Sequence, residues 1–159
     1  MNKYKIILIA IFVLYFYTAG EYLNNDGDSI EFITAGYCNG VPHSPGYPVF
    51  TRLLNCSMRL FSSALSVPKC AYLVNNILSV LNLWIIANII LNLCAKYIHK
   101  YGRGAATRFT EDSDSAQFKF ENYARIAAFA VVSAVLYISI SRTYWKESIS
   151  AEVYILHLV

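Results

Sequence analysis

The chain has 159 residues, of which 57% are hydrophobic and 14% are charged, and its formal net charge is +3. A soluble domain carries roughly 25% charged residues, so this composition indicates a membrane protein and argues against a disordered chain. The four cysteines form no CxxC pair, which argues against a disulfide-built secreted domain. The small, dispersed charge argues against a nucleic-acid partner, and the sequence has no Gly-rich phosphate loop or zinc signature.

Apolar runs recur at about 4–20, 71–95 and 124–141. These runs lie too far apart to form one core element, and they predict three transmembrane helices in an all-α membrane protein. The first run would span roughly 25 Å as a helix, the short end of a membrane span. A cleaved signal peptide is the alternative for this run, because Lys3 and Lys5 precede it and small residues follow it.

The distribution of basic residues predicts the orientation. Residues 96–125 hold six lysines and arginines, whereas the longer stretch 21–69 holds three. By the positive-inside rule, the amino terminus and a loop at 96–123 are cytoplasmic. Residues 21–70 and those from 142 onward then face outward, on the side away from the cytosol.

The second predicted span is unusually rich in asparagine. An amide that faces lipid without a partner is costly, so this helix should pack against other helices. At about 100° per residue, Asn75 and Asn82 share one face, and Asn88 and Asn92 share another. The helix therefore needs neighbours on two sides, which three spans can hardly supply.

The loop 21–70 between the first two spans is long, and its polar residues concentrate before Glu31. Asp28 followed by Glu31 forms a capping-box pattern, which predicts a helix that Gly40 would close. Such a helix would lie in the membrane interface with both carboxylates at its outer end. A carboxylate in this position can also act as a general base on a hydroxyl, and capping does not exclude that role.

A Pro-rich segment, Val41–Pro48, follows this helix and should hold its backbone rigid. His43 in this segment either packs in a turn or donates a hydrogen bond to a lipid phosphate. The next apolar stretch, 49–65, predicts a second interfacial helix that carries Arg52 and Arg59 on one face. These arginines either reach up to lipid headgroups or hold phosphate.

The run from Asp28 to Phe50, DSIEFITAGYCNGVPHSPGYPVF, closely resembles the first outer loop of a GT-C membrane glycosyltransferase family. The family is of the transmembrane protein O-mannosyltransferase type and includes bacterial relatives. Its pattern is Asp-Ser-Gly-Glu-Phe, a short helix, and then His-Pro-Pro-Gly-Tyr-Pro. Ile30 and Ser44 depart from this pattern, because they replace a Gly and the first Pro. Two further blocks also resemble the family: Asn76-Ile-Leu-Ser79, and Trp145 followed by Ala151-Glu-Val-Tyr-Ile-Leu156.

The resemblance implies the amino-terminal part of a GT-C fold and a transfer reaction outside the cytosol. The donor would be a sugar on a polyprenyl or dolichyl phosphate, and the acceptor a hydroxyl of a protein or a glycan. An acidic residue of the first outer loop would be the base, here Asp28 first or Glu31 second. The expected substrate-binding residues are His43, Tyr47, Arg52 and Glu152, and Arg142 is a further candidate beside the departing phosphate.

No cofactor is expected, and the resemblance leaves a metal requirement open. The expected partners are the lipid-linked sugar, the acceptor, the bilayer and further carboxyl-terminal transmembrane helices that would complete the fold. The apolar end Ala151–Val159 supports this view of residues 1–159 as an inactive amino-terminal piece of a longer protein. The membrane would be a bacterial inner membrane or the endoplasmic reticulum. The alternative is a small non-catalytic membrane protein or the remnant of a truncated gene.

Overall fold

The structure is a computed structural model that describes residues 3–23, 28–106 and 113–153. All regular secondary structure in these ranges is helical, which confirms the predicted all-α class. The helices are α1 (Lys3–Thr18), α2 (Ser29–Cys38), α3 (Pro48–Phe61), α4 (Val67–Ala106), α5 (Ser113–Ile140) and α6 (Arg142–Ser148).

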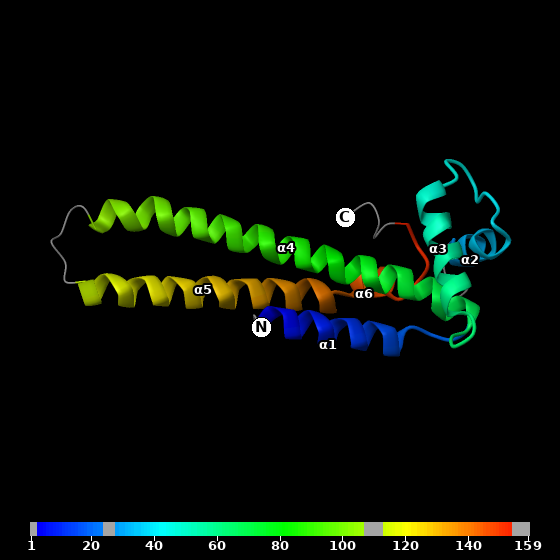
Figure 1. The fold of residues 1–159 in the computed structure, drawn as a ribbon, viewed down its shortest axis with the longest axis horizontal. Coiled ribbons are helices and arrows are strands. Elements are labelled where there is room, and N and C mark those ends of the chain that lie inside the picture. The colour runs from blue at the N-terminus through cyan, green and yellow to red at the C-terminus, as the bar shows by residue number, and fades with distance from the viewer. Residues whose placement is uncertain (1–2, 24–27, 107–112, 154–159) are drawn as a thin grey trace.

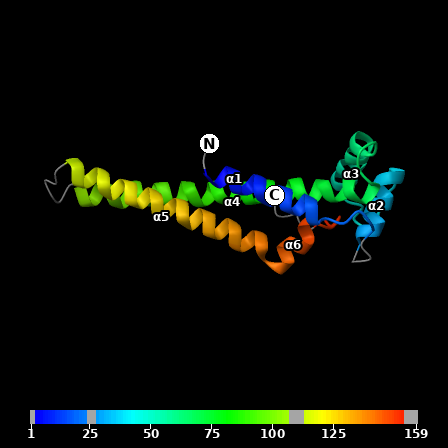
Figure 2. The same cartoon turned by 90° about the horizontal axis from the view of Figure 1, so that it is seen from below.

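A long pair of antiparallel helices, α4 and α5, forms the body of the molecule (Figure 1). Helix α1 packs along α4 and contacts α5, and both views place it beside the half of the pair nearer to α2 and α3 (Figure 2). Helices α2 and α3 pack on each other and on the first turns of α4. We call this end of the pair, with α2, α3, the start of α4 and α6, the site end.

One helical segment, Val67–Tyr97 of α4, is long and apolar enough to cross a membrane. Only 22% of its most apolar stretch is buried within the structure, whereas the core helix of a soluble protein is mostly buried. Arg125–Ile140 and Arg142–Ser148 meet this description only as a pair, bent by 70°, and the apolar helix Lys5–Thr18 is shorter than a span. The three predicted spans are therefore all helical, but their crossing of a membrane stays a prediction.

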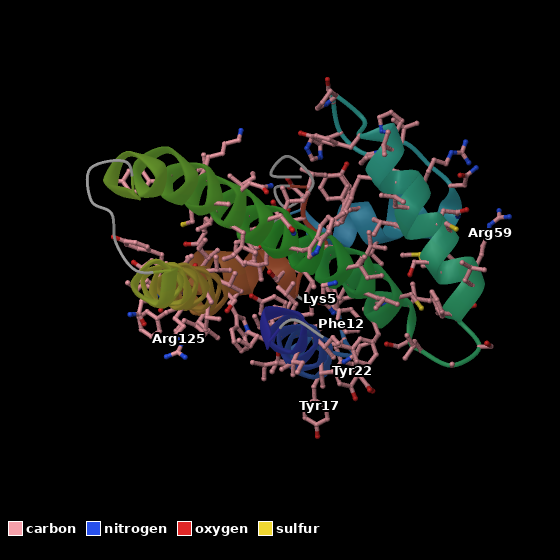
Figure 3. The ribbon with its side chains drawn as sticks, turned by 60° about the vertical axis from the view of Figure 1, so that its left-hand side comes forward. Lys5, Phe12, Tyr17, Tyr22, Arg59 and Arg125 are labelled. Atoms are coloured by element: carbon pink, nitrogen blue, oxygen red, sulfur yellow. The ribbon has the colours of Figure 1, made fainter. Side chains whose placement is uncertain are left out.

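Large apolar side chains cover the outer surfaces of the three long helices. Figure 3 shows Phe12 and Tyr17 projecting from α1. The exposed apolar side chains include Ile9, Val13, Ile77, Trp84, Ile89, Ile126, Phe129, Tyr137 and Ile140. Many exposed apolar side chains along a helix are what a lipid-facing helix presents.

The segment 96–123, expected as a loop, is helical at both of its ends. Helix α4 continues to Ala106, and α5 already begins at Ser113. Hydropathy identifies the segment of a helix that is long and apolar enough to cross a membrane, but it does not give the ends of the helix. A helix can extend beyond that segment where packing against a partner helix stabilises it.

The asparagines of α4 divide as their helical positions predict. Asn75 and Asn82 are buried against the rest of the chain, whereas Asn92 is exposed and Asn88 donates to the carbonyl of Trp84 in its own helix. Several buried polar atoms near the first face have no hydrogen-bond partner among the described residues; they belong to Asn75, Asn76, Ser79, Asn82 and Glu147.

Two tyrosines and a lysine join the helices at the site end. The Tyr15 hydroxyl of α1 donates to the carbonyl of Ser139 at 2.7 Å, where the bend after α5 leaves that carbonyl without a helical partner. The Tyr144 hydroxyl donates to the carbonyl of Ser79 at 2.7 Å. Buried Lys69 donates to the carbonyl of Ala19, just after α1, at 2.6 Å. These bonds hold α1, α4, α5 and α6 as one unit below the site.

Helices α2 and α3 approach most closely at Gly36. A Cβ on this residue would lie 2.8 Å from the Cβ of Leu54, and Asn55 donates to the Gly36 carbonyl at 2.7 Å. The absence of a side chain therefore sets the distance between the two helices of the site end.

Gly36→Ala should destabilise the fold. Alanine would favour the helix by up to about 1 kcal/mol, but the clash with Leu54 should cost about 1–3 kcal/mol and outweigh it. Thermal unfolding in detergent measures the net effect. Gly40→Ala is the control, because its Cβ would lie 3.8 Å from the nearest atom. Equal melting temperatures for the two variants would contradict the close packing.

Candidate functional site

The amino terminus of α2 does not use the capping box that the sequence predicts. Asp28 occupies the N-cap position, as expected, but its side chain makes no capping hydrogen bond. Glu31 lies in the first turn and bonds to His43 instead of returning to the Asp28 backbone. Both carboxylates are therefore directed to the loop that follows α2.

Glu152, more than 100 residues away, takes over the bonding at this helix end. Its carboxylate accepts hydrogen bonds from the Ser29 hydroxyl, at 3.2 Å, and from the backbone N–H of Asp28. Ser29 in turn accepts from the N–H of Ala151 at 3.2 Å, and Asn75 donates to the Glu152 carbonyl at 2.7 Å. The segment after α6 is thereby tied to both α2 and α4.

The loop after α2 positions His43. Asn39 ends the helix in the left-handed conformation, a role that the sequence assigned to Gly40. A turn follows in which the Gly46 N–H donates to the His43 carbonyl at 2.8 Å. The His43 ring packs against buried Phe32, with centroids 5.6 Å apart, and against Tyr47 at 5.8 Å. These ring contacts hold the His43 side chain beside the first turns of α2.

His43 joins the two carboxylates of α2. Its backbone N–H donates to the Glu31 carboxylate, and its Nδ1 lies 3.0 Å from Glu31 Oε2. Its Nε2 lies 3.8 Å from Asp28 Oδ2, beyond hydrogen-bond reach. The structure thus assembles Asp28, Glu31 and His43, which we call the carboxylate–imidazole cluster.

Hydrogen bonding has the largest effect on the pKa values of His43 and Glu31. The bond to Glu31 raises the pKa of His43 above its ordinary value, and the charges of Glu31, Asp28 and Glu152 act in the same direction. The same bonds lower the pKa of Glu31. Burial raises the pKa of Glu152, as do the charges of Glu147 and Asp28, against the opposing hydrogen bonds from Ser29 and Asp28.

The cluster is also the one group of metal-ligating side chains that the described part of the chain brings together. One ligand atom from each of Asp28, Glu31 and His43 lies within 4.8 Å of the others. Oxygen and imidazole ligands suit several divalent cations. A metal would have to displace the proton of His43, whose raised pKa strengthens that competition. A protonated His43 would itself supply a positive charge between the carboxylates.

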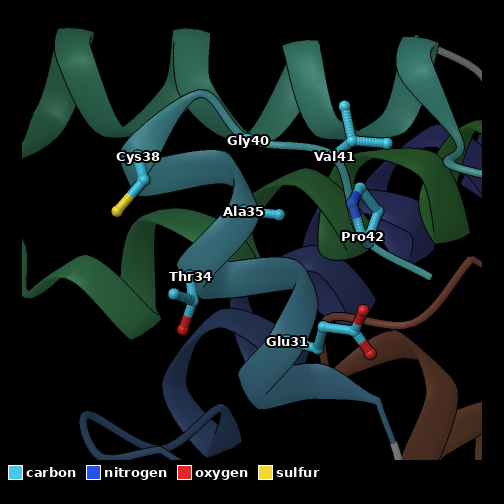
Figure 4. Close-up of a pocket in the computed structure, with 7 residues that line it drawn as sticks. All are labelled: Glu31, Thr34, Ala35, Cys38, Gly40, Val41 and Pro42. Atoms are coloured by element: carbon cyan, nitrogen blue, oxygen red, sulfur yellow. The ribbon is translucent and has the colours of Figure 1, made fainter.

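A shallow groove of about 360 Å³ lies beside the cluster (Figure 4). Thr34 and Cys38 line it from α2, Val41 and Pro42 line it from the loop, and Glu31 is the charged side chain among its lining residues. The groove therefore joins an apolar surface to one carboxylate of the cluster.

The remaining predicted site residues lie around the cluster or away from it. Tyr47, in the left-handed conformation, packs with its ring against Phe32 and His43. Arg52 donates to Asn39 Oδ1 at 2.6 Å, at the far end of α2 and about 15 Å along the helix from Asp28. Arg142 is exposed at the first residue of α6.

Ser29 and Asn75 form hydrogen bonds within the site, although neither is among the site residues predicted from the sequence. Nothing near Ser29 in the sequence indicates its partners, because both lie in the segment after α6. Asn75 carried a signal, since a buried asparagine in an apolar helix requires a polar partner. Its partners are the carbonyls of Glu147 and Glu152.

The fold and the site define a helical protein with a membrane-length apolar helix and an acid–base cluster at one end of its helix pair. Comparison with known families adds one match, to the protein O-mannosyl-transferase TMEM260 N-terminal domain, over residues 28–159. The chain therefore belongs to this family, which confirms the resemblance of its sequence blocks and assigns it to a glycosyltransferase type. No curated protein and no solved structure matches the chain.

Histidine titration tests the cluster. In the ¹³C-histidine NMR spectrum of the folded protein, His43 should titrate above the ordinary value near 6.5. Glu31→Gln should lower the pKa of His43 more than Asp28→Asn does, because the hydrogen bond to Glu31 is the largest cause. The opposite order, or an ordinary pKa in the unaltered protein, would contradict this geometry.

The pair should also make stability depend on pH. His43 binds its proton more tightly in the folded state, so its stabilisation is lost as pH rises through its raised pKa. Glu31 has a lowered pKa, so its contribution is lost as pH falls through that value. The melting temperature should be highest at pH values between the pKa of Glu31 and the pKa of His43. Glu31→Gln should make the melting temperature depend less on pH.

Proposed function

We propose that the site end transfers a sugar from a polyprenyl or dolichyl phosphate to a hydroxyl of a protein, with Asp28 as the general base. The observation that supports this proposal is that the start of α2 is bonded by a distant residue and not by its own acidic side chains. Glu152 bonds the helix end, and the side chain of Asp28 makes no capping bond and is exposed beside His43. Family membership supports the reaction class.

Asp28 is a better base than Glu31 in this arrangement. Glu31 accepts two hydrogen bonds from His43, and these lower its pKa and its basicity. The acceptor oxygen would attack the anomeric carbon while the bond between that carbon and the phosphate oxygen breaks. The hydroxyl proton would pass to Asp28, and the lipid phosphate would leave as an anion.

His43 would serve the departing phosphate. Its raised pKa favours the imidazolium, and its Nε2 is too far from Asp28 for a hydrogen bond. The N–H at Nε2 is therefore free to donate to a phosphate oxygen, and this bond would strengthen as negative charge develops on that oxygen. Arg52 is bonded to Asn39 at the other end of α2, so His43 is the cation nearest to both carboxylates among the proposed site residues.

The groove beside Glu31 suits the acceptor better than the donor. An anionic lipid phosphate would be repelled by Glu31 at the groove and by nearby Asp28. A neutral polypeptide segment carries no such penalty, and Thr34, Cys38 and Val41 offer it a small, mostly apolar surface. The acceptor hydroxyl would then reach the cluster from the α2 side.

We further propose three spans, with the amino terminus in the cytosol and the site end on the opposite side. The excess of basic residues in 96–125 over 21–69 supports this orientation. The antiparallel course of α4 and α5 also supports it, because α4 leads away from the site end and α5 returns to it (Figure 1). Further carboxyl-terminal helices would cover the exposed apolar faces.

Thiol labelling of intact cells tests the orientation. In a background without other cysteines, native Cys38, which is exposed at the site end, should react with a membrane-impermeant reagent. Ser115→Cys, in the predicted cytoplasmic segment at the start of α5, should react only after permeabilisation. The reverse pattern would place the site in the cytosol and remove the proposed reaction.

Isosteric substitution tests the base in the full-length protein as its gene encodes it. Asp28→Asn should reduce sugar transfer from a polyprenyl-phosphate donor by about 10²- to 10⁴-fold at unchanged expression. Glu31→Gln should reduce it less. Glu21→Gln, an exposed acid of the same loop outside the cluster, is the control and should retain activity. Near-normal transfer by Asp28→Asn would exclude Asp28 as the base.

A further inference from the structure

The carboxylate of Glu152 accepts the bond that Glu31 would accept in a capping box, from the backbone N–H of Asp28. It is 7% exposed and accepts from the Ser29 hydroxyl and from the Asp28 N–H. Helix amino termini leave N–H groups without partners and carry partial positive charge, so they favour a carboxylate. Asp28 and Glu31 have carboxylates in the same turn, but neither of them performs this function.

The position of Glu152 is itself fixed by hydrogen bonds. Its carbonyl accepts from the Asn75 amide of α4 at 2.7 Å, and the adjacent Ala151 N–H donates to Ser29. Ser29, Asn75 and Ala151 are fully buried. The segment after α6 therefore connects the rigid helix pair to the first turn of α2.

This connection lies directly beside Asp28 and Glu31, the two acidic residues of the carboxylate–imidazole cluster at the start of α2. Asp28 directly precedes Ser29, and Glu31 is in the same turn. If Asp28 had to cap its own helix, its side chain would fold back on the backbone of residues 30 or 31 and leave His43.

We propose that Glu152 is a positioning residue, which bonds the amino terminus of α2 so that the Asp28 carboxylate stays free to act as the base. The catalytic part of this inference rests on the proposed function, whereas the structural part does not. Glu152 acts through Ser29 and the Asp28 backbone and does not need to touch the substrate.

Hydrogen–deuterium exchange of the full-length protein tests the structural part. In Glu152→Ala, the peptide that contains Asp28–Ile33 should exchange about 10- to 100-fold faster, since it loses hydrogen bonds to a charged group. Glu152→Gln should stay close to the unaltered protein, because its amide oxygen can accept the same bonds. Glu147→Gln is the matched control; its buried Oε2 has no partner among the described residues, and its change should leave this peptide unaffected.

Sugar transfer by the same variants tests the positioning role. Glu152→Ala should lower kcat by about 10- to 100-fold with little change in the KM for the acceptor, because a misplaced base slows the reaction without weakening binding. Glu152→Gln should restore most of the activity. If Glu152→Ala fails to fold, Ser29→Ala removes the hydroxyl bridge alone and should change both measurements in the same direction.

The outcomes separate this inference from the proposed function. Unchanged exchange in Glu152→Ala would overturn the inference, and so would faster exchange with unchanged transfer. A Glu152→Gln variant that loses transfer while its exchange stays normal would also overturn it, since Glu152 would then act on the substrate. Failure of the proposed function would appear instead as full transfer by Asp28→Asn, a result on which the exchange measurement does not depend.

Discussion

The carboxylate of Glu152 at the amino terminus of α2 is the interaction on which the geometry of the site depends. A helix end without partners would draw in the nearest acidic side chains, and Asp28 and Glu31 are the nearest. Glu152 accepts from the Ser29 hydroxyl and from the Asp28 N–H, the bond that Glu31 would accept in a capping box, so Glu31 is available to His43. The Asp28 side chain makes no capping bond and is exposed. We infer that this buried contact between distant segments leaves both exposed carboxylates available to the loop that carries His43.

The supporting structure below this contact is rigid for separate reasons. Phe32 packs on Phe50 of α3 with ring centroids 5.4 Å apart, and Gly36 lets the two helices approach closely. Bonds from Tyr15, Tyr144 and Lys69 join the long helices. The cluster therefore lies on packed helices, with His43 supplied by a proline-rich turn, and this arrangement suits a reaction that needs a fixed distance between base and acceptor.

The sequence predicted the helical class, the approximate positions of all three long helices, and the short helices α2 and α3, but not α6. These elements follow from local patterns: apolar run length, Asp28 before a helical stretch, and proline at the start of α3. The predicted topology also put Asp28, Glu31, His43 and Glu152 on one side of the membrane, and the structure brings these residues close to one another. The exchange of the capping box for Glu152 could not be predicted, since a capping pattern does not show which distant carboxylate competes for the same N–H groups. The helical continuation of α4 past residue 96 was missed for a similar reason, because a partner helix supports it in place of apolar composition.

We propose that a lipid-linked sugar meets its acceptor at Asp28, Glu31 and His43. A cryo-electron microscopy structure of the full-length protein in a lipid nanodisc, with a non-hydrolysable polyprenyl-phosphate sugar bound, tests it most directly. We expect the anomeric carbon to face the Asp28 carboxylate, with the phosphate on the His43 side and the groove beside Glu31 open to the acceptor. A sugar bound away from α2, or at the opposite end of the α4–α5 pair, would contradict it.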